Sequence, residues 1–164
     1  MDSEALKWLF SSIAQTYGAL VGILGMLVVY KLQLIANMIR EIRQKYMGAI
    51  YHFFGLESYV ITDRQLVKSW KSIAKDQEVT PEKNTMDDFA KTIEPLLHKS
   101  NEIRSEFTRF LVPHLALILT SIILLLITDQ IATLDFGIVI GLLIVLLAIS
   151  FIMILSLCIT LITE

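Results

Sequence analysis

This 164-residue chain has few of the residues that cross-link or interrupt a polypeptide: one cysteine, three prolines and seven glycines. The single cysteine, Cys158, has no second cysteine with which to form a disulfide in the same chain, which excludes a disulfide-stabilised domain. Strand-forming runs are nearly absent, with YVIT at residues 59–62 as the one candidate. The sequence therefore predicts an all-α protein, and its long apolar runs predict that this protein is an integral membrane protein.

Catalytic and ligand-binding motifs are also missing. The three histidines, His52, His98 and His114, have no cysteine or carboxylate at metal-ligand spacing, and the sequence holds no glycine-rich phosphate loop or nucleophile motif. Between residues 31 and 109, 13 bases are nearly balanced by 11 acids, which gives no nucleic-acid footprint. We therefore predict no enzyme activity, no cofactor, no metal ion and no nucleic-acid partner. His114 is a candidate pH sensor because it lies at the start of an apolar run.

Charge is absent from long parts of the chain. Residues 110–164 contain no Lys or Arg, and the whole chain is 55% hydrophobic and 18% charged, whereas soluble domains are about 25% charged. Crossing a membrane takes about 20 apolar residues, and three uncharged runs have about that length or more: residues 10–30, 110–128 and 136–162. We predict three transmembrane helices there, because a chain of this size cannot cover so much apolar surface with protein.

The distribution of positive charge predicts the orientation in the membrane. Of the 14 Lys and Arg residues, 13 lie between Lys31 and Arg109, and such an excess is typical of cytoplasmic segments. On the other side, residues 1–9 contain only Lys7, and the turn 129–135 has two acids and no base. We therefore predict a multi-pass protein of the cell membrane, with residues 1–9 and 129–135 outside and residues 31–109 and 163–164 in the cytoplasm.

The cytoplasmic segment has a helical pattern throughout. Apolar residues recur every three or four positions after Tyr30, so the first span is predicted to continue as one rod to about residue 54, with Gly55 as the stop. TDRQ at residues 62–65 matches a capping box that opens a helix at about 63–77. A further helix is predicted at about 86–109, interrupted at Pro95 and running into the second span, where Pro113 introduces a kink.

Small and polar residues form one stripe along the first span. On a helix that advances about 100° per residue, the first six residues of this stripe fall within an arc of about 80°. The members of this glycine stripe are Ser11, Gln15, Gly18, Gly22, Gly25, Val29 and Gln33. The same spacing continues to Arg40 and Arg43.

The glycine stripe has two interpretations. In the first, Gly18 and Gly22, preceded by Ala14, are a GxxxG packing face, since small residues four positions apart let helices approach closely in lipid, and Gly137 and Gly141 in the third span are the counterpart. In the second, several copies of the first span surround an axis and the stripe lines an ion pathway. The inner exit of that pathway is then formed by Arg40 and Arg43.

Two functional classes remain open. The preferred one is a small homo-oligomeric membrane channel with a cytoplasmic helical region for assembly or gating, because three spans are too few to enclose a pathway in one chain. The alternative is a membrane-anchored scaffold or sensor whose cytoplasmic helices bind a protein partner and whose glycines serve only for helix packing. The expected partners are the lipid bilayer, further copies of this chain and, for the channel, small inorganic ions.

Overall fold

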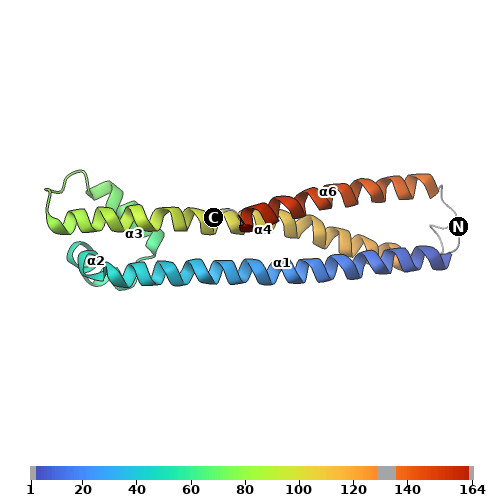
Figure 1. Ribbon diagram of the computed structural model, residues 1–164, viewed down its shortest axis with the longest axis horizontal. Helices are drawn as coiled ribbons and strands as arrows, with labels where there is room; N and C mark the ends of the chain where they lie inside the picture. Colours follow the sequence, from blue (N-terminus) through green and yellow to red (C-terminus); the bar gives the residue numbers. More distant parts are fainter. Residues whose placement is uncertain (1–2, 129–135, 163–164) are drawn as a thin grey trace. The chain divides into compact units, whose positions relative to one another are not determined.

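The computed structural model describes residues 3–128 and 136–162 of the chain. In these ranges the chain is helical apart from short turns and contains no strand. The elements are α1 (Ser3–Lys45), α2 (Met47–Phe54), the 3₁₀ helix η1 (Gly55–Tyr59), α3 (Asp63–Ile73), α4 (Pro81–Leu126) and α6 (Phe136–Ile162) (Figure 1). The predicted all-α class is confirmed. The predicted turn 129–135 and residues 163–164 lie outside the described residues.

The chain divides into two compact units. Unit 1 comprises Met1–Tyr30 together with Ile103–Glu164, and unit 2 comprises Lys31–Glu102. Unit 2 therefore begins at the first residue of the predicted cytoplasmic segment, and it ends seven residues before the predicted end of that segment at residue 109. Each unit has its own apolar interior.

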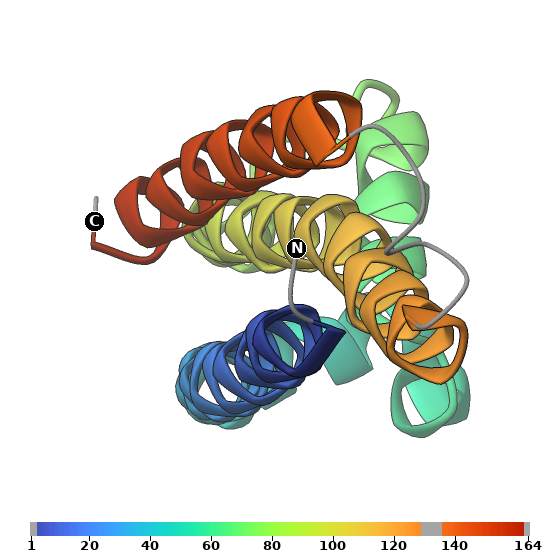
Figure 2. The same cartoon turned by 90° about the vertical axis from the view of Figure 1, so that its right-hand side faces the viewer.

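Unit 1 is a bundle of three helices in which α4 lies between α1 and α6 (Figure 2). The ring centroid of Tyr17 on α1 is 5.6 Å from that of His114 on α4, and Ser150 on α6 is hydrogen-bonded to the same histidine. Apolar side chains from all three helices are buried in this bundle: Leu6, Phe10, Ile13, Leu24, Val28, Ile103, Phe110 and Leu157.

Among the described residues, two helices are long and apolar enough to cross a membrane, namely α1 and α4. Their most apolar windows of 18 residues have mean hydropathies of 2.0 and 2.1, and only 17% of each window is buried. The core helix of a soluble protein is mostly buried, so this exposure favours lipid as the surrounding medium. The apolar stretch Leu147–Ile162 in α6 is shorter, and α6 as a whole has the bounds predicted for the third span.

Unit 2 has a compact apolar core to which α2, α3 and the first part of α4 contribute. The buried cluster consists of Tyr46, Ile50, Leu66, Val67, Trp70, Met86, Phe89, Ala90 and Ile93. Its largest side chain, Trp70, is only 1% exposed, and its Nε1–H donates a hydrogen bond of 2.8 Å to Asp87 Oδ1. The one polar atom of the indole is therefore satisfied, as burial of a tryptophan requires.

The first span continues as one long helix, as predicted, but this helix ends at Lys45 and the predicted end at about residue 54 is wrong. α1 ends at Lys45 and α2 begins at Met47, with Tyr46 (φ −99°, ψ 8°) between them. Tyr46 is buried against Phe89, and its hydroxyl donates a hydrogen bond to Asp88. Phe89 and Asp88 lie on α4, more than 40 residues after Tyr46 in the sequence. Local periodicity therefore contains no signal for the break between α1 and α2.

Two local predictions around α3 are confirmed. Thr62 Oγ1 accepts a hydrogen bond of 3.4 Å from the Gln65 amide, and Gln65 Oε1 accepts one of 3.3 Å from the Thr62 amide, which completes the capping box. Gly55 follows the last residue of α2 with a φ of 54°, a conformation that glycine adopts without a steric penalty. α3 ends at Ile73 and not at 77, because the polar residues that follow offer no apolar side chain to bury beyond Ala74.

The predicted bounds of the next helix are also corrected, since α4 begins at Pro81 and not at residue 86. Thr80 Oγ1 accepts a hydrogen bond of 3.1 Å from the Lys83 amide, and Pro81 occupies the first helical position, where its missing N–H has no cost. The predicted interruption at Pro95 is absent, and α4 continues through Pro95 and Pro113. Pro95 lies on the exposed side of the helix, where water can bond the carbonyl group that the proline leaves without an amide partner.

The contact between Tyr46 and Asp88 predicts a pH effect. The pKa of Tyr46 is raised above its ordinary value of 10.0, first because its hydroxyl donates to Asp88, and further because of burial and the negative charge of Asp88. A raised pKa favours the neutral phenol in the folded chain, so its contribution to stability is complete below about pH 10 and is lost as the pH rises through the raised pKa. We expect the Tyr46→Phe variant to lose less stability over this alkaline range than the unmodified protein.

Ultraviolet absorbance of tyrosinate during an alkaline titration measures the effect directly. Tyr46 should ionise above its ordinary pKa of 10.0, and subtracting the titration of the Tyr46→Phe variant isolates its absorbance. Asp88→Asn should move the Tyr46 titration back toward the ordinary range. Ionisation of Tyr46 at its ordinary pKa in the unmodified protein would contradict the role given to Asp88.

Candidate functional site

The glycine stripe of α1 lies mostly on the surface of the described chain. Gln15, Gly18, Gly22, Val29 and Gln33 are exposed, while Ser11 and Gly25 are half-buried. The side chains of α1 that are buried in unit 1 belong to a different face: Leu6, Phe10, Ile13, Leu24 and Val28. At about 100° per residue, the centres of the two faces are roughly 120° apart around the helix. Unit 1 therefore uses its apolar face for packing and leaves the glycine stripe largely uncovered.

The contacts of the glycines show how open this face is. No atom of the described chain outside the local helix lies within 4 Å of a Cβ built on Gly18 or Gly22, while a Cβ on Gly25 would lie 3.6 Å from Phe107 Cζ. Ala14 is half-buried. Gly141 likewise has no neighbour within 4 Å, and Gly137 lies in α6 with its surroundings outside the described part of the chain. Within the described protomer, the two GxxxG pairs are thus not brought together.

Two polar side chains of the stripe are bonded to each other. Gln15 Nε2 donates a hydrogen bond of 3.3 Å to Ser11 Oγ one turn earlier. Within the described residues this is the only hydrogen bond of the Gln15 side chain, although an amide side chain offers two N–H donors and an acceptor oxygen. An exposed glutamine in an apolar helix is therefore incompletely satisfied by its own protomer.

The two arginines of the predicted inner exit have different surroundings. Arg40 is exposed on α1. The guanidinium group of Arg43 donates to Asp63 Oδ1 at 2.7 Å, to the Ser58 carbonyl at 2.5 Å and to the Ile61 carbonyl at 3.0 Å. Arg43 thus fixes the turn between η1 and α3 against α1, since the planar guanidinium offers several donors in one fork.

A second polar site lies inside unit 1, centred on His114. The side chain is 1% exposed, and its ring centroid is 4.0 Å from that of Phe110. His114 Nδ1 is 2.6 Å from the Phe110 carbonyl oxygen, and Nε2 is 2.5 Å from Ser150 Oγ, which is itself 4% exposed. Both ring nitrogens are therefore hydrogen-bonded, and they join α4 to α6.

The partners of His114 determine which nitrogen carries the proton. A carbonyl oxygen can only accept, so Nδ1 must be the N–H donor to Phe110. In the neutral ring, Nε2 is then an acceptor, and the Ser150 hydroxyl donates to it. The arrangement satisfies a polar group that would otherwise be costly in an apolar interior.

Ser150 is a site residue that the sequence analysis missed. Its signal was present, because it is a hydroxyl residue inside an otherwise apolar run, as are Ser121 and Thr128, which are 5% and 1% exposed. Polar residues within a span usually face the interior of a bundle. What the sequence could not show is that residues 114 and 150 lie opposite each other.

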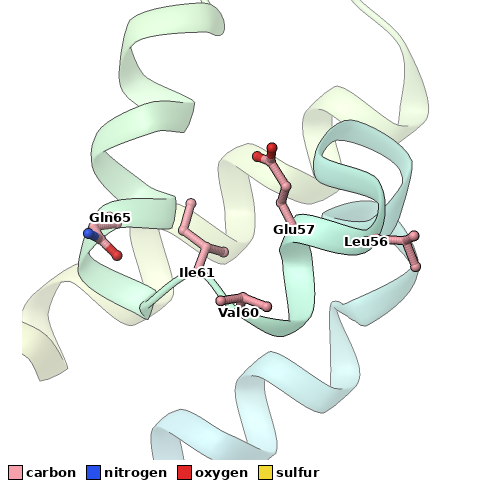
Figure 3. Close-up of a pocket in the computed structure, with 5 residues that line it drawn as sticks. All are labelled: Leu56, Glu57, Val60, Ile61 and Gln65. Atoms are coloured by element: carbon pink, nitrogen blue, oxygen red, sulfur yellow. The ribbon is translucent and has the colours of Figure 1, made fainter.

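The turn after α2 presents apolar side chains to solvent, two of which, Leu56 and Val60, are drawn in Figure 3. We call Leu56, Tyr59 and Val60 the apolar tip; they are 77%, 68% and 86% exposed. Beside the tip, a shallow pocket of about 530 Å³ is lined by Leu56, Glu57, Val60, Ile61 and Gln65. Exposed apolar groups that adjoin a pocket are typical of a binding surface.

Other ligand chemistry finds little support among the described residues. No three His, Cys, Asp or Glu side chains in residues 3–128 and 136–162 are grouped so that they could hold a metal ion. Cys158 is a half-buried free thiol in α6. Comparison of the chain with protein-family models, with curated proteins and with solved structures finds no match. Its function is therefore inferred from the residues and contacts described above.

Proposed function

We propose that the protein is a small homo-oligomeric ion channel whose pathway is lined by the glycine stripe of α1. Residues 10–30, 110–128 and 136–162 are its three spans, with the N-terminus outside and the C-terminus in the cytoplasm of the cell. The excess of Lys and Arg in residues 31–109 supports this orientation. Unit 2 then forms a cytoplasmic region that assembles or gates the oligomer.

The observation that carries this proposal is the uncovered state of the glycine stripe. Gln15 is exposed and incompletely hydrogen-bonded, and Gly18 and Gly22 have no neighbour within the described protomer. In hydrocarbon, a glutamine side chain requires a protein or water partner, and bare glycine surface favours close approach of another helix. Both requirements are met when copies of α1 surround a water-filled axis.

The proposal predicts that ion flux depends on this stripe. Purified protein in liposomes should conduct ions, and Gly22→Leu should reduce the flux at least about tenfold, because a bulky apolar group at a narrow pathway blocks and dewets it. Leu27→Ala is the matched control, since Leu27 is exposed on another side of the same helix. A voltage-sensitive dye reports the ion flux, which is compared between each variant and the unmodified protein.

Two results would contradict the channel. The first is a strictly monomeric protein in native mass spectrometry from detergent, because a single protomer cannot enclose a pathway. The second is the absence of flux in the unmodified protein at every voltage and pH tested. Equal loss of flux in Gly22→Leu and Leu27→Ala would exclude the stripe as the lining.

A membrane-anchored scaffold is the second candidate, and the apolar tip favours it. Three exposed apolar side chains beside a pocket fit a protein partner that inserts an apolar residue. On this proposal the protein conducts nothing, and Val60→Asp abolishes partner binding without affecting oligomer formation. Flux and binding therefore separate the two candidates.

A further inference from the structure

A basic groove runs along the surface of unit 2 between α3 and α4. The groove has a volume of about 320 Å³. Along its edges lie Arg64, Lys68 and Lys71 from α3 and Glu94, His98 and Asn101 from α4, and its floor is formed by Val67 and Leu97. The edge residues are spaced by three and four positions, so that each helix presents one continuous row.

Both ends of the groove are closed by side-chain contacts between the two helices. At one end, the guanidinium group of Arg64 donates a hydrogen bond to Asn101 Oδ1. At the other end, Lys71 Nζ and Glu94 Oε1 are 2.5 Å apart. Between these contacts lie Lys68 and His98, which have no hydrogen-bond or ion-pair partner within the described residues 3–128 and 136–162. The middle of the groove therefore presents the Lys68 ammonium group and the imidazole ring of His98, whose N–H can donate.

The charges of the groove do not balance. Glu94 is its only acid and is already paired with Lys71. Arg64 bonds to a neutral amide, and Lys68 has no acid beside it in the groove, so two positive charges remain uncompensated. Phosphomonoesters carry a charge of about −1.5 to −2 at neutral pH and have three acceptor oxygens. A group of this kind matches both the charge and the donors.

We propose that this groove binds a phosphomonoester, with its phosphate between Arg64, Lys68 and His98. A bound phosphate accepts hydrogen bonds from both α3 and α4 and thereby joins the two helices at a position where the described side chains form no hydrogen bond or ion pair between them. The site lies in unit 2 and does not depend on ion conduction.

Two sources can supply such a phosphate. The phosphomonoester belongs either to a soluble metabolite or to a lipid with a phosphorylated headgroup.

Isothermal titration calorimetry of the full-length protein in detergent tests the proposal, with glycerol 3-phosphate as the soluble probe. We expect saturable binding that weakens at least about tenfold in Lys68→Ala, since the charge-assisted hydrogen bond from the ammonium group to the phosphate is lost. Lys91→Ala is the matched control, because Lys91 is an exposed lysine of α4 outside the groove. In Lys91→Ala the affinity should be unchanged.

A second arm identifies the source. Nanodiscs that contain phosphatidylinositol 4-phosphate are compared with nanodiscs of phosphatidylcholine alone, and tighter binding to the former than to glycerol 3-phosphate assigns a lipid ligand. Trp70 fluorescence confirms that each variant retains the core of unit 2. Absence of saturable binding in both arms, or an equal loss in Lys68→Ala and Lys91→Ala, overturns the proposal. Neither result bears on ion flux, so the channel and the phosphate site succeed or fail separately.

Discussion

The Phe89→Ala variant is expected to lower the free energy of unfolding of unit 2 by about 3 to 5 kcal/mol, the range observed when a buried aromatic side chain is removed. Phe89 is 0% exposed and packs in the buried cluster, with its ring centroid 5.8 Å from that of Tyr46. Its removal opens a cavity between α2 and α4 that the tightly packed neighbours cannot fill. This loss is a large part of the stability of a small domain.

Trp70 provides the measurement, because it lies in the same buried cluster. Denaturant titrations followed by tryptophan fluorescence are performed in a Trp8→Phe background, since Trp8 is the other tryptophan and is 75% exposed. Tyr59→Ala is the control, as Tyr59 is 68% exposed and its removal should change the stability by less than about 0.5 kcal/mol. Similar losses in Phe89→Ala and Tyr59→Ala would show that the cluster is not the stabilising core.

A second large effect is expected at the His114 and Ser150 pair in unit 1. Ser150→Ala removes the hydroxyl that donates to His114 Nε2 and leaves that nitrogen buried without a partner. We expect a cost of about 1 to 3 kcal/mol, because an unsatisfied buried polar group keeps its full desolvation penalty. The double variant His114→Phe with Ser150→Ala should be less destabilised than the sum of the single variants, since both polar partners are then absent.

Thermal unfolding in detergent, followed by circular dichroism, gives the four stabilities of this double-mutant cycle. Thr120→Ala is a suitable control, because Thr120 is an exposed hydroxyl residue on α4, the helix that carries His114. Additive effects of the two single substitutions would mean that His114 and Ser150 do not stabilise unit 1 through their mutual contact. A favourable interaction energy between the two side chains would also support the packing of α4 against α6 at His114 and Ser150.

Local features of the fold could be predicted because neighbouring residues cause them. The capping box at Thr62 and Gln65 depends on side chains three positions apart, and the end of α2 depends on the freedom of Gly55 to adopt a positive φ. The apolar runs are long enough to specify helices of membrane-spanning length. The prediction failed at Pro95. This proline was expected to interrupt α4, but its position on the exposed side allows the helix to continue.

The candidate sites were only partly predictable. The glycine stripe was defined from periodicity, but leucine, isoleucine and valine occupy much of the remaining surface of α1, so the sequence did not specify which face packs within the protomer. Arg43 was assigned to an inner exit from its position in that stripe, whereas its three hydrogen bonds are to residues 15 to 20 positions further along the chain. The basic groove was not predicted, because its two rows come from separate helices.

Composition and periodicity were sufficient to establish that the protein is helical and that its most apolar segments suit a membrane, because both properties depend on residues that are close together in the chain. Only the tertiary structure decided that α1 buries Leu6, Phe10 and Ile13 and leaves Gln15 and Gly22 uncovered, and that α1 ends just before Tyr46. It also paired His114 with Ser150, 36 residues away. These features depend on the rotation and register of one helix against another, which are set by packing and hydrogen bonds between distant side chains.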